Sequence, residues 1–166
     1  WQAFATFLPT FFAEYLTFST SFSAVAFGVF FLFSALLQPV MGLVSDRLSR
    51  DVVLFGALLL VAGSLGVLLL RPTATQVIPV LVLLGIGSSW AGVIQAKFMD
   101  ALPEANRGSG FGLVRTIYLL VGSLGSGVTG TIADTVGWPQ AMGLIGGLLL
   151  FAAALIALNR ALDLGL

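Results

Sequence analysis

The stretch Gly42-Leu43-Val44-Ser45-Asp46-Arg47-Leu48-Ser49-Arg50-Asp51 places four charges directly after some twenty residues that carry none. The residues before it, 24–44, are nearly all apolar. About 20 apolar helical residues are enough to cross the ~30 Å hydrocarbon core of a bilayer. A short charged turn behind such a segment marks one face of a membrane. The stretch therefore predicts a membrane-spanning helix that ends in a charged loop.

The composition supports an all-α integral membrane protein. Of the 166 residues, 58% are hydrophobic and only 8% are charged, whereas soluble domains carry about 25% charged residues. The mean hydropathy is +1.10. The net charge is zero, which gives no reason to expect nucleic acid as a partner.

Cysteine and histidine are both absent from the chain. Their absence removes disulfides, thiol catalysis, imidazole acid–base chemistry and the commonest transition-metal ligands. No nucleotide-binding loop and no nucleophile with a base is visible either. The sequence therefore predicts no enzyme, no cofactor and no metal site.

Apolar segments alternate with short clusters of charged or turn-forming residues, and irregular backbone cannot face lipid. We therefore expect one bundle over 1–166, in which successive helices run antiparallel. The predicted spans lie at about 1–17, 22–45, 52–70, 76–97, 109–133 and 140–159.

The basic residues near the span ends predict the orientation of the chain. One side of the membrane holds only Arg71, and the other holds Arg47, Arg50, Lys97, Arg107 and Arg160. The positive-inside rule makes the second side cytoplasmic, with both ends of the chain on that side. Six arginines against a single lysine indicate a GC-rich prokaryote, and so its plasma membrane.

The chain does not begin with methionine, and Trp1 already lies in apolar sequence. No basic flank of a signal peptide precedes the first apolar segment. We therefore expect a fragment that begins partway along a first spanning helix.

The charged loop also matches a known signature. Gly42, Asp46, Arg47 and Arg50 fit the pattern Gly-x-x-x-Asp-Arg/Lys-x-Gly-Arg-Lys/Arg, although serine replaces the second glycine and Asp51 the final basic residue. This pattern is the loop between the second and third helices of each half in the major facilitator superfamily. Residues 7–14 are similar to that family's first-helix "FLPxYxxE" stretch, and residues 102–134 to its fifth or eleventh helix. The chain thus resembles this family over nearly its whole length.

Members of that family have twelve helices in two similar halves. The resemblance implies that this chain is one six-helix half of a secondary transporter, which moves a small solute by alternating access. Its partners would be the solute, the lipid bilayer and the other half. The C-terminal half is favoured, because the chain ends about seven residues after the sixth span. The resemblance also implies that helices 1, 2, 4 and 5 line the path. The competing hypothesis is a membrane sensor or structural subunit that retains the fold without transport.

Physical arguments assign roles to the signature loop. Gly42 allows close approach of a neighbouring helix. Asp46 lies at a helix C-terminus, where a carboxylate is unfavourable, so it should seek a cation or another helix N-terminus. Arg47 and Arg50 can pair with Asp46 or with phosphate head groups. The resemblance implies that this cluster latches the two halves in the outward-facing state, while a purely topological role stays open.

Two charged residues inside the predicted spans are candidates for substrate binding or coupling. Glu14 lies about one turn from the outer boundary of the first span, where a carboxylate can take up a proton or simply mark the interface. Arg115 lies two turns beyond Arg107, and an arginine there costs about 2.5–3.5 kcal/mol on insertion scales. It should therefore bind an anionic substrate, pair with Asp46 or Asp100, or extend its side chain to the interface. Tyr118 adds a hydrogen-bond donor nearby.

Polar residues on other predicted spans are further candidates for the path. Pro39 should bend the second span and free a carbonyl, which Gln38 can satisfy unless it faces the cavity. The fourth span adds Ser88, Ser89 and Gln95. Organic-anion uptake and drug efflux both stay open, because Arg115 favours the first and the phenylalanine-rich helices favour the second.

Small residues recur at helical spacing in the fourth and fifth spans, where they let helix backbones pack closely in lipid. We expect packing roles for Gly85, Gly92, Gly122, Ser126 and Gly130.

Overall fold

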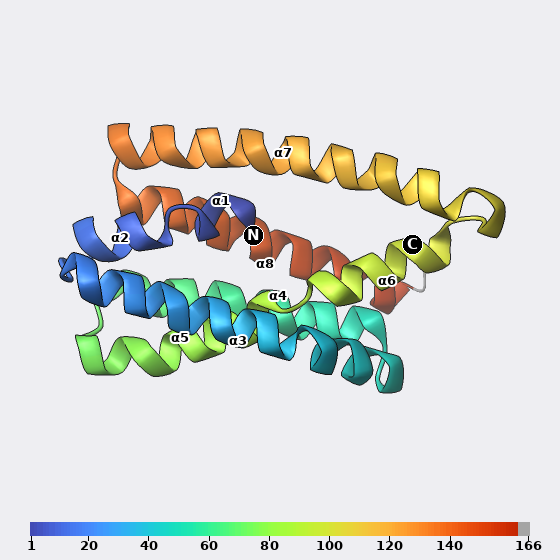
Figure 1. Cartoon of the computed structure of the whole chain (residues 1–166), viewed down its shortest axis with the longest axis horizontal. Coiled ribbons are helices and arrows are strands. Elements are labelled where there is room, and N and C mark those ends of the chain that lie inside the picture. The colour runs from blue at the N-terminus through green and yellow to red at the C-terminus, as the bar shows by residue number, and fades with distance from the viewer. Residues whose placement is uncertain (163–166) are drawn as a thin grey trace.

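The computed structural model describes residues 1–162, apart from the side chain of Ala105. It is a helical bundle whose long helices run side by side along one axis (Figure 1), and the described residues contain no strand. The elements are α1 Gln2–Ala5, α2 Leu8–Glu14, α3 Thr20–Arg47, α4 Arg50–Leu69, α5 Ala74–Ser88, α6 Ala91–Ala101, the 3₁₀ turn η1 Glu104–Asn106, α7 Arg107–Thr135 and α8 Trp138–Leu162.

Five segments of the described chain are long and apolar enough to cross a membrane. They are Thr20–Arg47, Arg50–Leu69, Ala74–Ala101, Arg107–Thr135 and Trp138–Leu162. The segment predicted as a first span, 1–17, instead forms two short helices, α1 and α2. Pro9 explains the division, because it stands at the start of α2 and cannot donate a backbone hydrogen bond to the preceding turn.

The helix predicted over 76–97 is also divided, into α5 and α6. At the division the Ser89 hydroxyl donates to the carbonyl of Ile86 over 2.6 Å. Such a local bond competes with the helical ladder, and Ser89 and Trp90 form a turn between the two helices. Pro39, by contrast, does not end its helix, because α3 continues through it to Arg47.

Helix termini are satisfied by side chains that the sequence places there. The hydroxyl of Ser49 accepts the N–H of Val52 at the start of α4 (3.2 Å), and Ser19 does the same for Phe22 at the start of α3. Gly137 takes a φ of +119° between α7 and α8, a conformation that glycine adopts without a steric clash. Short connections of this kind make α7 and α8 antiparallel neighbours.

The best-packed part of the bundle is made by α3, α4, α5 and α8. Helix α4 packs along α5 and α8, and α3 packs along α5. Helix α7 lies at the edge of the bundle and contacts α1 and α8 (Figure 1). No residue in its most apolar stretch is buried.

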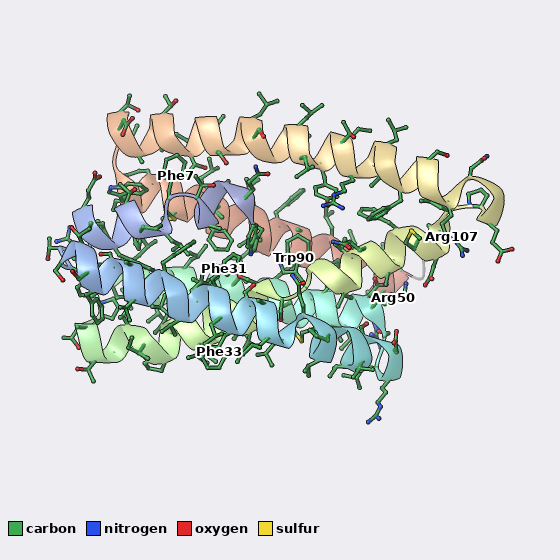
Figure 2. All side chains as sticks on the ribbon, in the orientation of Figure 1. Phe7, Phe31, Phe33, Arg50, Trp90 and Arg107 are labelled. Carbon is green, nitrogen blue, oxygen red and sulfur yellow. The ribbon has the colours of Figure 1, made fainter. Side chains whose placement is uncertain are left out.

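Aromatic side chains fill the core on the side of α1 and α2. Phe4, Phe11, Phe12 and Phe30 are buried there, and Phe4 packs edge-on against Phe30 at 6.1 Å between ring centroids. Phe31 follows Phe30 on α3 (Figure 2). Its side chain is half exposed. The phenylalanines near the N-terminus therefore act both in packing and on the outer surface.

Candidate functional site

Five helix termini meet at one end of the bundle, which we call the charged end. Helices α3, α6 and α8 finish there, and α4 and α7 begin there (Figure 1). The signature loop connects α3 to α4 at this end. Because α3 finishes at Arg47 and α4 begins at Arg50, only two residues connect the helices, and the second of them, Ser49, caps α4. The charged residues of the signature loop therefore lie on the helical backbone on either side of this connection.

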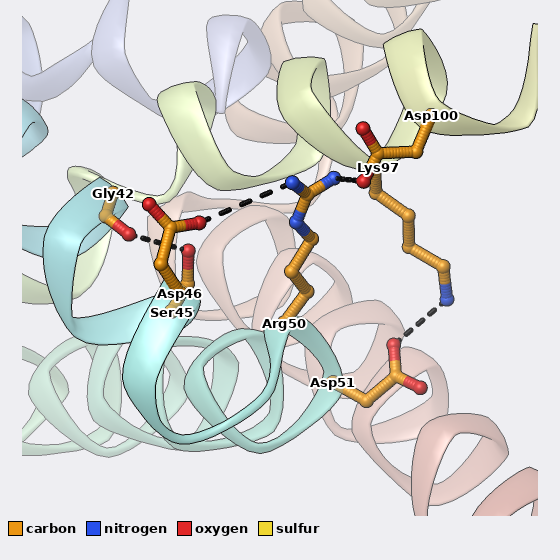
Figure 3. A network of polar contacts seen from close by, with 7 residues as sticks. All are labelled: Gly42, Ser45, Asp46, Arg50, Asp51, Lys97 and Asp100. Atoms are coloured by element: carbon orange, nitrogen blue, oxygen red, sulfur yellow. Dashed lines mark hydrogen bonds and ion pairs between the residues drawn. The ribbon is translucent and has the colours of Figure 1, made fainter.

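Arg50 is the centre of a charge network at this end (Figure 3). Its guanidinium forms an ion pair with Asp100, at the end of α6, and lies 4.0 Å from the carboxylate of Asp46, one turn back along the chain. The Arg50 side chain is only 25% exposed, so its pairing is less screened by water than that of a surface arginine. The network therefore attaches the signature loop to α6.

A second ion pair joins the same two elements. Lys97 of α6 donates to the carboxylate of Asp51 over 2.7 Å (Figure 3). Asp51 lies in the first turn of α4, where the helix dipole also favours a negative charge. Lys97 and Asp100, one turn apart on α6, thus match Asp51 and Arg50 with opposite charge. The one-turn spacing of Lys97 and Asp100 was the signal in the sequence for this pairing. From the sequence alone, Lys97 was used only to orient the chain in the membrane.

The other residues of the signature loop make few contacts. Gly42 accepts the hydroxyl of Ser45 at its carbonyl oxygen over 2.7 Å, but a Cβ built on it meets no atom within 4 Å. The expected close approach of a helix at Gly42 is therefore absent among residues 1–162. Arg47 is exposed and makes no ion pair with any described residue.

Arg115 and Tyr118 lie on α7, and both are exposed. No ion pair joins Arg115 to Asp46 or to Asp100 within the described chain. The adjacent Thr116 turns its hydroxyl back to the carbonyl of Gly112 at 3.0 Å. Of the predicted roles of Arg115, anion binding and extension to the interface stay open.

The polar residues expected along the path lie on α3, α5 and α6. Gln38 and Gln95 are exposed, and Ser89 is buried with its hydroxyl bonded to the helix backbone. Ser88 is 1% exposed, and its hydroxyl has no hydrogen-bond partner among the described residues. Arg107, at the start of α7 (Figure 2), likewise has a buried Nε without a partner in that part of the chain.

Glu14 lies at the opposite end of the bundle, at the end of α2. It accepts the indole N–H of Trp138, the first residue of α8, over 2.9 Å. Next to it, the Tyr15 hydroxyl donates to the carbonyl of Leu69 over 2.9 Å. The guanidinium of Arg71 stacks on the Tyr15 ring as a cation–π contact, with its Cζ carbon 4.3 Å from the ring centroid. Trp138 and Tyr15 were not predicted as partners, although aromatic residues near a membrane interface were the available signal.

The predicted small residues of α5, α6 and α7 lie where a neighbouring helix or side chain approaches closely. A Cβ on Gly85 would lie 2.7 Å from the carbonyl oxygen of Phe30, so α5 and α3 touch backbone to backbone there. One on Gly92 would make an ordinary contact of 3.6 Å with Gln38. On α7, Gly122 and Gly130 face Gln2 and Phe7, and the Ser126 hydroxyl donates to the carbonyl of Gly122 (3.1 Å). Within residues 1–162, no three acidic side chains are grouped so that they could hold a metal ion.

An apolar bundle of spanning length with a charge network at one end defines a polytopic helical membrane protein. The sequence model of the major facilitator superfamily matches residues 1–163. The chain therefore belongs to the major facilitator superfamily, a family of membrane transporters and not of enzymes. The search of curated proteins and the search of solved structures found no match.

Proposed function

We propose that this chain is one six-helix half of a secondary transporter that carries a small solute by alternating access. Family membership supports transport. The observation that carries the finer proposal is the charge network, in which Arg50 attaches the signature loop to α6 through Asp100. Such a network in a chain with only 8% charged residues points to a conformational role for that loop.

The network divides the loop charges into two groups. Arg50 is engaged within the chain, whereas the Asp46 side chain is 64% exposed and Arg47 is exposed without a described partner. We infer that Arg50 and Asp100 hold the loop in position, and that Asp46 and Arg47 reach across to the other half. Opening of the inner gate would then break the contacts of Asp46 and Arg47 while the Arg50–Asp100 pair persists.

The other half would pack against α7. Its apolar stretch contains no buried residue, and a shallow groove of about 430 Å³ runs along its outer face. Ser123, Gly127 and Thr131 line the groove at spacings of four residues, which suits close approach of a second helix. This uncovered face supports a twelve-helix assembly, of which we propose the chain to be the C-terminal part.

We propose that the charged end is cytoplasmic, with both ends of the chain on that side and the plasma membrane of a prokaryote as its location. The positive-inside rule supports this orientation. Residues 1–166 contain no cysteine, so an Arg47→Cys variant of the complete protein, with any cysteine of the other half replaced, can be labelled at this position with a membrane-impermeant maleimide. Labelling is expected only after the cells are opened. Labelling of intact cells would reverse the orientation and remove the inner-gate role of the loop.

The substrate proposal rests on Arg115. An exposed arginine within a spanning helix, without an acidic partner among residues 1–162, favours an organic anion. Uptake of anions by proteoliposomes that contain the complete protein tests it. Arg115→Gln should abolish anion uptake, Arg115→Lys should retain part of it, and export of a neutral drug should be unaffected. Unchanged anion uptake by Arg115→Gln would contradict the substrate role.

Alternating access has its own test on α7. Single cysteines at Leu113, near the charged end, and at Val128, toward the other end, occupy exposed positions on this helix. Substrate should change their alkylation rates in opposite directions, because one end of the path closes as the other opens. Solute binding without any such change, and without flux, would favour the sensor hypothesis instead.

A further inference from the structure

We propose that the groove between the start of α4 and the end of α8 binds an anionic phospholipid. The groove has a volume of about 490 Å³, and its lining residues lie in the first turns of α4 and the last turns of α8, at the charged end. This volume lies within the ~300–1,000 Å³ range of small-molecule sites, enough for a lipid head group and the first methylenes of its chains. The proposal requires only that the bundle spans a bilayer.

The walls of the groove are apolar, and its rim is charged. Val52 and Phe55 of α4 face Ile156 and Ala157 of α8, and no polar side chain interrupts this surface. Asp51 and Arg160 stand at the rim, in the first turn of α4 and the last turn of α8. An apolar surface below a charged rim at a helix terminus matches the order of acyl chain and head group in one leaflet.

The charge balance at the rim selects the head group. The negative charge of Asp51 is compensated by Lys97, which lies 2.7 Å away (Figure 3). Arg160 is exposed and forms no ion pair within residues 1–162. Among the described residues, Arg160 is therefore the one charge at the rim that no acidic side chain compensates, and it suits a phosphate whose head group carries no cation of its own. Phosphatidylglycerol fits this description, whereas phosphatidylcholine adds a quaternary ammonium next to Arg160.

The position in the bundle favours lipid over a soluble anion. The groove lies between α4 and α8, outside the α7 face that we assign to the other half. A free phosphate would use Arg160 and leave the apolar walls unoccupied, whereas a phospholipid contacts both. We therefore assign the groove to a lipid of the leaflet at the charged end.

A fluorophore on a single cysteine reports which lipid occupies the groove. Ala157→Cys places it in the groove, and Leu155→Cys places it on an exposed part of α8 outside the groove. The full protein is reconstituted with phosphatidylglycerol or phosphatidylcholine that carries the same nitroxide quencher. We expect the label at Ala157→Cys to prefer phosphatidylglycerol about fivefold, the ratio that one basic residue near the membrane contributes. The label at Leu155→Cys should show little preference.

Charge variants separate a site from general attraction to the surface. Arg160→Gln should reduce the preference to about one, and Arg160→Lys should restore most of it. Arg47→Gln removes the same charge at the same end outside the groove, and should leave the preference intact. Added inorganic phosphate should not compete.

Three results would overturn the proposal: equal quenching by both lipids, equal loss in Arg47→Gln and Arg160→Gln, or displacement by phosphate. Misfolding of Arg160→Gln would be evident from altered quenching at Leu155→Cys, and Arg160→Lys then decides the outcome. Because the assay measures lipid and not solute, failure of the transport proposal would leave this result unchanged.

Discussion

Replacement of Gly85 by alanine should separate α5 from α3. A Cβ at this position would lie 2.7 Å from the Phe30 carbonyl oxygen, 2.8 Å from the Phe33 Cβ and 3.1 Å from the Ser34 backbone nitrogen. Two of these atoms are backbone and the third is a Cβ, so no flexible side chain can move aside. One helix must shift, and the contacts along the interface loosen.

The size of the effect follows from a matched control. Gly56 of α4 is also in a helix interior, but a Cβ on it meets nothing within 4 Å. Both variants gain about 0.5–1 kcal/mol of helix propensity, so this term cancels between them. Overpacking of a well-filled site costs about 1–3 kcal/mol. Gly85→Ala should therefore melt about 3–9 °C below Gly56→Ala, at roughly 3 °C per kcal/mol for a chain of this size.

The assay is thermal unfolding in detergent, followed by tryptophan fluorescence. Gly92→Ala provides an intermediate case, because its Cβ would make an ordinary 3.6 Å contact with the Gln38 carbonyl oxygen. Its melting temperature should stay near that of Gly56→Ala. If Gly85→Ala melts within about 1 °C of Gly56→Ala, the backbone contact between α3 and α5 does not exist in the protein.

Three further predictions concern the two ends of the bundle. Lys97→Met and Asp51→Asn should show a coupling energy of about 0.2–1 kcal/mol in a double-mutant cycle, which decreases in high salt because the pair is part-exposed; additive effects would show that the pair contributes nothing. Trp138→Phe should lower the unfolding free energy by about 1 kcal/mol through loss of the hydrogen bond to Glu14, and an unchanged melting curve would dismiss that bond. Glu14→Gln keeps an oxygen that accepts the indole N–H, so its stability should match wild type, measured by the same melting curve. If Glu14 couples protons, a proton gradient should drive solute transport in the wild type and should have no effect on transport by Glu14→Gln. A response to the gradient that persists in Glu14→Gln would exclude coupling through Glu14.

Contacts of the candidate site between residues close in the sequence could be predicted from helical spacing. Asp46 was expected to seek a cation, and the guanidinium of Arg50, one helical turn along the chain, lies 4.0 Å from its carboxylate. Such a contact depends only on helical spacing. The pairing of Arg50 with Asp100 depends on where α6 ends relative to α4, and no local pattern contains that distance. For the same reason Glu14 was recognised as an interfacial acid, while its partner Trp138, 124 residues away, was not.

The sequence by itself determined the class of the protein. Long apolar segments that carry almost no charge can only be helices in lipid, because every backbone polar group must be satisfied within the segment. Hydropathy and the signature loop therefore established a helical membrane protein and its resemblance to the major facilitator superfamily, which the family match to residues 1–163 confirms. Hydropathy and the signature loop depend on the order of residues in the chain, and they can be read without knowing which helices are in contact.

Only the tertiary structure decided which helices touch and which surfaces stay open. In lipid the hydrophobic effect does not distinguish one apolar face from another, so packing of small residues and a few charged contacts select the neighbours. Gly85 against Phe30 and the pairing of Arg50 and Lys97 with acidic partners hold α3, α4, α5 and α6 together. The uncovered face of α7 and the groove beside Arg160 follow from that selection.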